Sequence, residues 1–76
     1  MEDEDVTDLR QKIGREIREA RLLAGISQED LALMADIDRS YVSQLERGIA
    51  NPSLLILHRL AKVLKSELYV TIRNVG

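Results

Sequence analysis

Apolar residues in the first third of the chain recur every three or four positions, with charged residues between them. This spacing is typical of an amphipathic helix, and it predicts one helix from about Thr7 to Ala24. Gly25 follows the last residue of the stripe and is expected to end the helix in a left-handed conformation. The predicted inward stripe consists of Leu9, Ile13, Ile17, Ala20 and Ala24.

Two shorter helices are predicted next. Ser27 can cap a helix over about residues 28–35, whose apolar face is Leu31, Ala32 and Ala35. Residues 36–38 read as a short turn that ends in a cap. A third helix is predicted from Arg39 to about Arg47, ended by Gly48, with Val42 and Leu45 directed inward.

A loop over residues 50–53 contains Pro52 and precedes a fourth helix, predicted over about residues 54–65 with Ser53 as its cap. This helix has two apolar stripes, which is more apolar surface than one core contact requires. Candidate residues for a dimer contact on this helix are Leu55, Ile56 and Val63.

The C-terminal segment alternates apolar and polar residues, the period of a half-buried strand. Its apolar positions are Leu68, Val70 and Ile72. A single strand leaves its own backbone unpaired, and no other segment of the chain offers a partner. We therefore expect it to pair with the same strand of a second subunit; a frayed tail or one more helical turn is the alternative.

Charge is divided unevenly along the 76 residues, whose formal net charge is −2. Residues 1–8 hold five acids and no base, and we expect a disordered acidic leader there. From Leu9 onward eleven bases and eight acids give about +3. A basic body suits nucleic acid, although the arginines of the first helix can equally be a solvated face.

Several function classes are not indicated. The chain has no cysteine for a disulfide or a cysteine-ligated metal, and no apolar run of membrane-spanning length, so we expect a soluble, cytoplasmic protein. His58 is the only histidine, and a packing or surface role suits it better than metal binding. No catalytic constellation or phosphate loop is present. The sequence predicts no enzyme, no metal and no cofactor.

Two short helices joined by a tight turn and packed by a longer first helix form a helix-turn-helix. The residues from Ile13 to Leu64, IGREIREARLLAGISQEDLALMADIDRSYVSQLERGIANPSLLILHRLAKVL, resemble the lambda-repressor-like helix-turn-helix family. The size resembles restriction-modification controller proteins, and the tail resembles the C-terminal strand of some antitoxins. The resemblance implies an all-α bundle of four to five helices with a short C-terminal β-strand that pairs across a dimer.

In such a motif the second helix enters the major groove, and its N-terminal residues contact base edges. Once Val42 and Leu45 point inward, the outward positions are those of the candidate base readers. An arginine can read guanine and a glutamine can read adenine. The candidates are Arg39, Ser40, Ser43 and Gln44.

Other residues are candidates for backbone phosphate contacts, which position a protein without reading sequence. Gln28 matches the family glutamine that binds a phosphate and braces the recognition helix. Tyr41 can contact DNA or pack partly in the core. The full set is Gln28, Arg18, Tyr41, Arg47 and Asn51; the loop of residues 49–51 lacks the Lys or Arg that family members often carry.

Two further positions have structural roles. Arg21 and Glu46 match a family pair in which a helix-one arginine meets a glutamate near the end of helix three, partly buried. Gly14 lies inside the first helix, where it lowers helix propensity and allows close packing.

The sequence predicts a dimeric, sequence-specific regulator that binds a palindromic operator in double-stranded DNA. We expect the DNA-binding domain over residues 9–66 and a dimerisation tail over residues 67–76. The alternative is an antitoxin-type interaction module that binds a partner protein, a toxin or part of the transcription machinery, and uses DNA binding for autoregulation.

Overall fold

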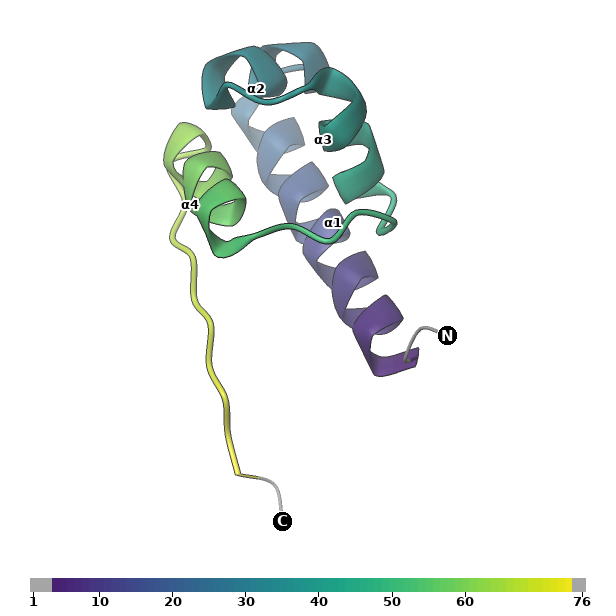
Figure 1. Cartoon of the computed structure of the whole chain (residues 1–76). Coiled ribbons are helices and arrows are strands. Elements are labelled where there is room, and N and C mark those ends of the chain that lie inside the picture. Colours follow the sequence, from purple (N-terminus) through teal and green to yellow (C-terminus); the bar gives the residue numbers. More distant parts are fainter. Residues whose placement is uncertain (1–3, 75–76) are drawn as a thin grey trace.

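Four helices form the part of the chain that the structure, a computed structural model, describes, which is residues 4–74. They are α1 (Glu4–Ala24), α2 (Gln28–Ala35), α3 (Arg39–Glu46) and α4 (Leu54–Val63). The long α1 packs against α3, and α2 packs against α3 and α4 (Figure 1). The predicted all-helical fold is confirmed. None of the described helices is long and apolar enough to cross a membrane.

The core lies where α2, α3 and α4 meet the second half of α1. Its most deeply buried side chains are Leu31, Val42, Leu45 and Leu60, each at most 2 % exposed. The inward faces predicted for the second and third helices are therefore correct. Small residues on α2 let the neighbouring helices approach closely. The remaining buried apolar residues are Ile17, Ala32, Ala35 and Ala50.

Helix ends follow local capping chemistry. The Ser27 hydroxyl accepts a bond from the Asp30 amide at 3.0 Å, and the Asp30 carboxylate accepts from the Ser27 amide, which completes a capping box. Ser53 caps α4 in the same way through the Ile56 amide, at 3.2 Å. Gly25 has a φ of 71°, the left-handed conformation predicted for it. These residues thus explain the predicted starts of α2 and α4 and the predicted end of α1.

The first helix begins earlier than the apolar pattern suggests. α1 starts at Glu4, so the prediction of a disordered leader over residues 1–8 is wrong for residues 4–8; residues 1–3 lie outside the described part. Glu4 and Asp5 occupy the first helical turn, where acids interact favourably with the helix dipole. Leu9, a predicted inward residue, is 55 % exposed because no described element covers this end of α1.

The C-terminal segment also differs from the prediction. α4 ends at Val63 rather than Lys65: the Ser66 amide donates to the Ala61 carbonyl at 2.8 Å, and Lys65 takes a φ of 52°. Beyond it the described tail runs away from the body as an extended segment (Figure 1), without the predicted strand. A strand is defined by its hydrogen-bonded partner, so pairing across a dimer stays a prediction.

Candidate DNA-binding surface

The turn between α2 and α3 is fixed by backbone hydrogen bonds. Asp36 has a φ of 58°, a left-handed conformation in which its amide reaches the last carbonyls of α2. The Ile37 amide donates to the Ala32 carbonyl at 2.9 Å, and the Ile37 side chain packs against the core. Asp38 takes the N-cap position of α3 without a side-chain cap bond. The angle between α2 and α3 is therefore set by the backbone hydrogen bonds of the turn and by the packing of Ile37 against the core.

One face of α3 is buried and the opposite face is open. Val42 and Leu45 are 0 % and 2 % exposed. Three of the four candidate base readers, Arg39, Ser40 and Gln44, are exposed, and Ser43 is half-buried. Tyr41 is half-buried and packs against the core. The outward face of α3 thus presents an arginine, a serine and a glutamine, with Ser43 partly covered.

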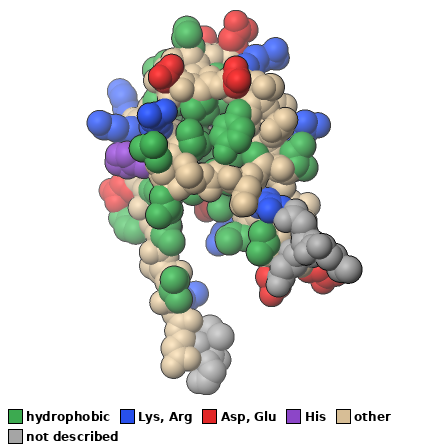
Figure 2. Space-filling model, in the orientation of Figure 1, with side chains coloured by type: hydrophobic (Ala, Val, Ile, Leu, Met, Phe, Trp, Pro, Cys, Tyr) green, Lys and Arg blue, Asp and Glu red, His purple; other side chains and the backbone are tan. Residues whose placement is uncertain are grey.

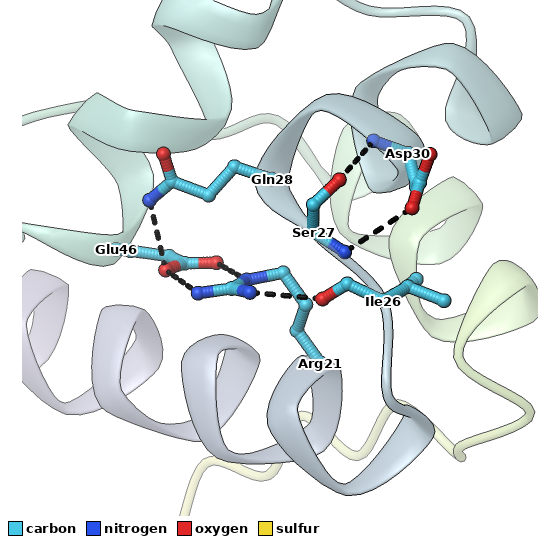
Figure 3. Close-up of polar contacts among 6 residues, drawn as sticks. All are labelled: Arg21, Ile26, Ser27, Gln28, Asp30 and Glu46. Carbon is cyan, nitrogen blue, oxygen red and sulfur yellow. Dashed lines mark hydrogen bonds and ion pairs between the residues drawn. The ribbon is translucent and has the colours of Figure 1, made fainter.

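A buried polar network joins the three helices that position this surface (Figure 3). Arg21, on α1, donates from Nε to Glu46 Oε2 at 2.7 Å and from Nη2 to Glu46 Oε1 at 3.1 Å. Its Nη1 donates to the Ile26 carbonyl at 2.9 Å, just before α2. The two side chains of the ion pair are 11 % and 3 % exposed. This two-point contact fixes the last residue of α3 relative to α1.

The amide of Gln28 completes the network. Its Nε2 donates to Glu46 Oε1 at 3.1 Å, so the first residue of α2 is tied to the last residue of α3. The hydrogen bond to Glu46 is the main cause that raises the pKa of Arg21 above its ordinary value, and burial opposes it. The guanidinium therefore stays charged, and the network holds at any physiological pH.

Three of the other candidate phosphate contacts, Arg18, Arg47 and Asn51, lie at the surface of the chain. Arg18 and Arg47 are exposed, and so is Asn51 in the loop before Pro52. Gln28 is half-buried by its bond to Glu46. Contacts of these residues with DNA remain predictions, because the structure describes only the free protein surface.

Candidate dimer residues divide into two groups. Ile56 and Val63 are half-buried and pack partly against the core of their own chain, so they offer less free surface than predicted. Leu55 on α4 is exposed, and so are the three tail residues. His58 is exposed on α4, and within residues 4–74 no cluster of three or more His, Cys, Asp or Glu side chains is arranged to hold a metal.

Sequence reasoning did not identify two features of this region. The family resemblance indicates that Gln28 braces the recognition helix, but no local pattern identifies Glu46, 18 positions away, as its partner. Gly14 was expected to allow close packing, but its partner was not named. The structure shows that a Cβ there would lie 2.9 Å from the Glu46 carbonyl oxygen and closer still to that of Leu45. Any larger residue would push α3 away from α1.

Comparisons with known proteins agree with this geometry. The family profile described as "Helix-turn-helix" matches residues 17–70. The chain is 38% identical over 58 residues to the control protein C.BamHI of Bacillus amyloliquefaciens, with 75% of this chain and 72% of that protein covered. It is 41% identical over 51 residues to an uncharacterized HTH-type transcriptional regulator of Methanothermobacter thermautotrophicus, with 67% and 74% covered.

Solved structures show the same likeness. The restriction-modification controller protein C.AhdI of Aeromonas hydrophila superposes with a TM-score of 0.74 at 45% identity, covering 76% of this chain and 88% of that one. The wild-type controller protein C.Esp1396I superposes with a TM-score of 0.74 at 36% identity, covering 78% of each chain. The profile match over residues 17–70 contains the whole α2–turn–α3 unit and the residues Arg21, Gln28 and Glu46 of the polar network. The chain belongs to the lambda-repressor-like helix-turn-helix family of DNA-binding transcriptional regulators.

Proposed function

We propose that the protein is a sequence-specific regulator that binds a palindromic operator as a dimer, with α3 of each subunit in a major groove. The observation that carries this proposal is the two-sided character of α3. Its apolar face is closed into the core, and its opposite face presents Arg39 and Ser40 at the N-terminal end and Gln44 in the second turn. Residues at that end of a recognition helix are the ones that reach base edges.

The polar network gives this surface its rigidity. Because Glu46 binds both Arg21 and Gln28, α3 is held against α1 and α2 at its far end. Direct base reading needs such a fixed docking angle, since a hydrogen bond to a base edge tolerates little displacement. Phosphate contacts from Gln28, Arg18, Tyr41, Arg47 and Asn51 would set the position of the body along the backbone.

In the proposed dimer, the second subunit reads the second half-site of the operator. One short helix reads few base pairs, and two copies related by a two-fold axis read half-sites about 34 Å apart. Exposed apolar residues on α4 and on the tail, such as Leu55 and Ile72, are available for this contact. The proposed activity takes place in the cytoplasm and needs no catalytic step, metal or cofactor.

Of the two alternatives raised by the sequence, the relatives favour the regulator. They are named as transcriptional regulators and controller proteins, and those names describe control of gene expression rather than neutralisation of a toxin. A toxin or other protein partner is not part of the proposal.

The test is selection of binding sites from a random duplex pool, followed by salt titrations on the selected duplex and on a scrambled one. We expect a palindrome whose affinity falls steeply as salt rises. Arg39→Ala should relax the preference at one base pair in each half-site, at a loss of about 1–3 kcal/mol per contact.

Arg47→Ala is the matched control, because Arg47 is also an exposed arginine and lies at the opposite end of α3, at its C-cap. Loss of a phosphate contact should weaken all duplexes alike and reduce the salt slope by about one. Equal affinity for selected and scrambled duplexes would contradict sequence-specific binding, and an Arg39 variant with unchanged base preference would contradict the assignment of that residue.

A further inference from the structure

α3 ends in a Schellman motif that fixes the first residues of the following loop. Arg47 is the C-cap, and Gly48 takes a φ of 76°. The Gly48 amide donates to the Leu45 carbonyl at 3.1 Å. The Ile49 amide donates to the Gln44 carbonyl at 3.0 Å. These two bonds define the motif, so the backbone of Ile49 is held beside that of Gln44.

Both neighbours of Ile49 are anchored to the body. Gly48 is buried against α1, where a Cβ would lie 2.9 Å from the Cα of Gln11. Ala50 is 7 % exposed and belongs to the core. Between them the Ile49 side chain is 60 % exposed. Its branched Cβ restricts χ1, so an apolar side chain is presented to solvent with little rotational freedom.

Exposure alone does not mark a contact. Hydrophobic side chains reach the surface of the body at several places among charged ones (Figure 2), and single exposed apolar residues are common in proteins. Ile49 differs in its surroundings. In a Schellman motif the residue at its position frequently packs on an apolar residue of the last helical turn, but here those residues are Ser43 and Gln44. The apolar surface of Ile49 thus stays open beside a candidate base reader.

We propose that Ile49 contacts the 5-methyl group of a thymine in the operator, within one base pair of the position read by Gln44. The proposal rests on the proposed function and adds a specificity-determining residue outside α3. Thymine carries its methyl group on the major-groove edge, where apolar side chains recognise it by contact. Glutamine reads adenine, and the thymine paired with that adenine presents its methyl group in the same groove.

The composition of the loop favours a methyl group over a phosphate as the partner of Ile49. Residues 49–51 contain no Lys or Arg, and an isoleucine side chain offers phosphate neither charge nor a hydrogen bond. Arg47 and Asn51, both exposed, are the candidates for phosphate contacts at this end of α3. Covering a charged phosphate with an apolar group also costs free energy. Ile49 therefore adds sequence preference rather than general affinity for DNA.

The test replaces thymine by deoxyuridine, which removes only the methyl group. In the duplex selected with the full chain, each thymine is replaced in turn, symmetrically in both half-sites, and the affinity is measured at one salt concentration. Burial of one methyl group corresponds to about 4-fold in affinity. We expect the wild type to lose about 4-fold per half-site at one thymine, in or next to the base pair at which Gln44→Ala relaxes the preference.

Substitutions at position 49 assign this effect to the isoleucine. Ile49→Ala should bind the thymine and the deoxyuridine duplex equally, and Ile49→Val should keep part of the difference. Both variants keep the backbone bonds of the motif, so their thermal unfolding should match that of the wild type. Leu23→Ala is the matched control, because Leu23 is 89 % exposed at the end of α1, beside Met34 and Val63, and this variant should keep the full effect.

The contact and the proposed function can fail separately. A selected half-site without a thymine within one base pair of the Gln44 position would exclude the contact, and so would a methyl effect of equal size in the wild type and in Ile49→Ala. If Gln44→Ala leaves the base preference unchanged, the location assigned to the methyl group is wrong. An Ile49→Ala variant that binds all duplexes equally weakly would assign the side chain to the sugar–phosphate backbone. If no duplex is selected, the proposed function fails and the contact fails with it.

Discussion

Replacing Gly14 with alanine sets two opposing effects against each other. Alanine is the stronger helix former, and in the interior of α1 it would stabilise the helix by about 1 kcal/mol. Its Cβ would, however, lie 2.9 Å from the carbonyl oxygen of Glu46 and closer to that of Leu45. Both atoms belong to the backbone of α3, so no side-chain rotation relieves the overlap.

The steric overlap with α3 outweighs the gain in helix propensity, so the substitution destabilises the folded chain. Overpacking typically costs about 1–3 kcal/mol, and rigid backbone atoms on the opposing helix place this site at the upper end. After subtraction of the gain in propensity, we expect Gly14→Ala to lower the free energy of unfolding by about 2 kcal/mol. For a domain of this size that corresponds to a fall in Tm of roughly 8–16 °C.

Urea and thermal denaturation followed by circular dichroism measure this loss. Arg15 is the next residue and is exposed, so the difference between Arg15→Gly and Arg15→Ala gives the local helix propensity without any overlap. If Gly14→Ala unfolds at the same urea concentration as the wild type or higher, α1 and α3 can separate at little cost. The close-packing argument would then be refuted.

Two further predictions concern the polar contacts. Arg21→Met leaves the Glu46 carboxylate, 3% exposed, with the Gln28 amide as its only partner in the network, and should lower the free energy of unfolding by about 3–5 kcal/mol in urea denaturation. The double variant Arg21→Met/Glu46→Leu removes the buried charge and should recover much of this loss; a double variant no more stable than Arg21→Met would contradict this reasoning. Because the pKa of Arg21 is raised, its contribution is complete below the ordinary pKa of an arginine and is lost only at more alkaline pH. The cost should therefore be equal at pH 6 and pH 9. Ser27→Ala removes the capping box of α2 and should lower the free energy of unfolding by about 1 kcal/mol. Ser53→Ala, at the simpler cap of α4, gives the comparison. No change in the stability of either variant would show that solvent caps these helices equally well.

The helices were predictable because their signals are local. Apolar spacing and the residues Ser27, Gly25 and Ser53 define most of the helix ends within the sequence itself. The start of α1 was misjudged because a run of acids suggests disorder, although acids also favour the first turn of a helix. Leu9 continues the apolar stripe beyond the body, and periodicity alone does not reveal where the covering elements end.

Contacts between residues far apart in the sequence were harder to predict. Only the family resemblance indicates the pairing of Arg21 with Glu46 and a contact from Gln28 to the recognition helix, and it does not identify Glu46 as the partner of Gln28. Gly14 stood out as a poor helix former, but only the folded chain shows that α3 is the neighbour that requires it. The pairing of the tail depends on a second molecule, so neither the sequence nor one folded chain determines it.

The bond between Gln28 and Glu46 has a consequence for the entropy of binding. A free glutamine side chain loses about 1.5–2 kcal/mol of rotamer freedom when it is immobilised. In this protein the Gln28 amide is already held, at 3.1 Å, by a carboxylate that is itself fixed by Arg21. Much of that ordering occurs when the chain folds, so a partner that binds the second amide hydrogen of Gln28 meets a preorganised group.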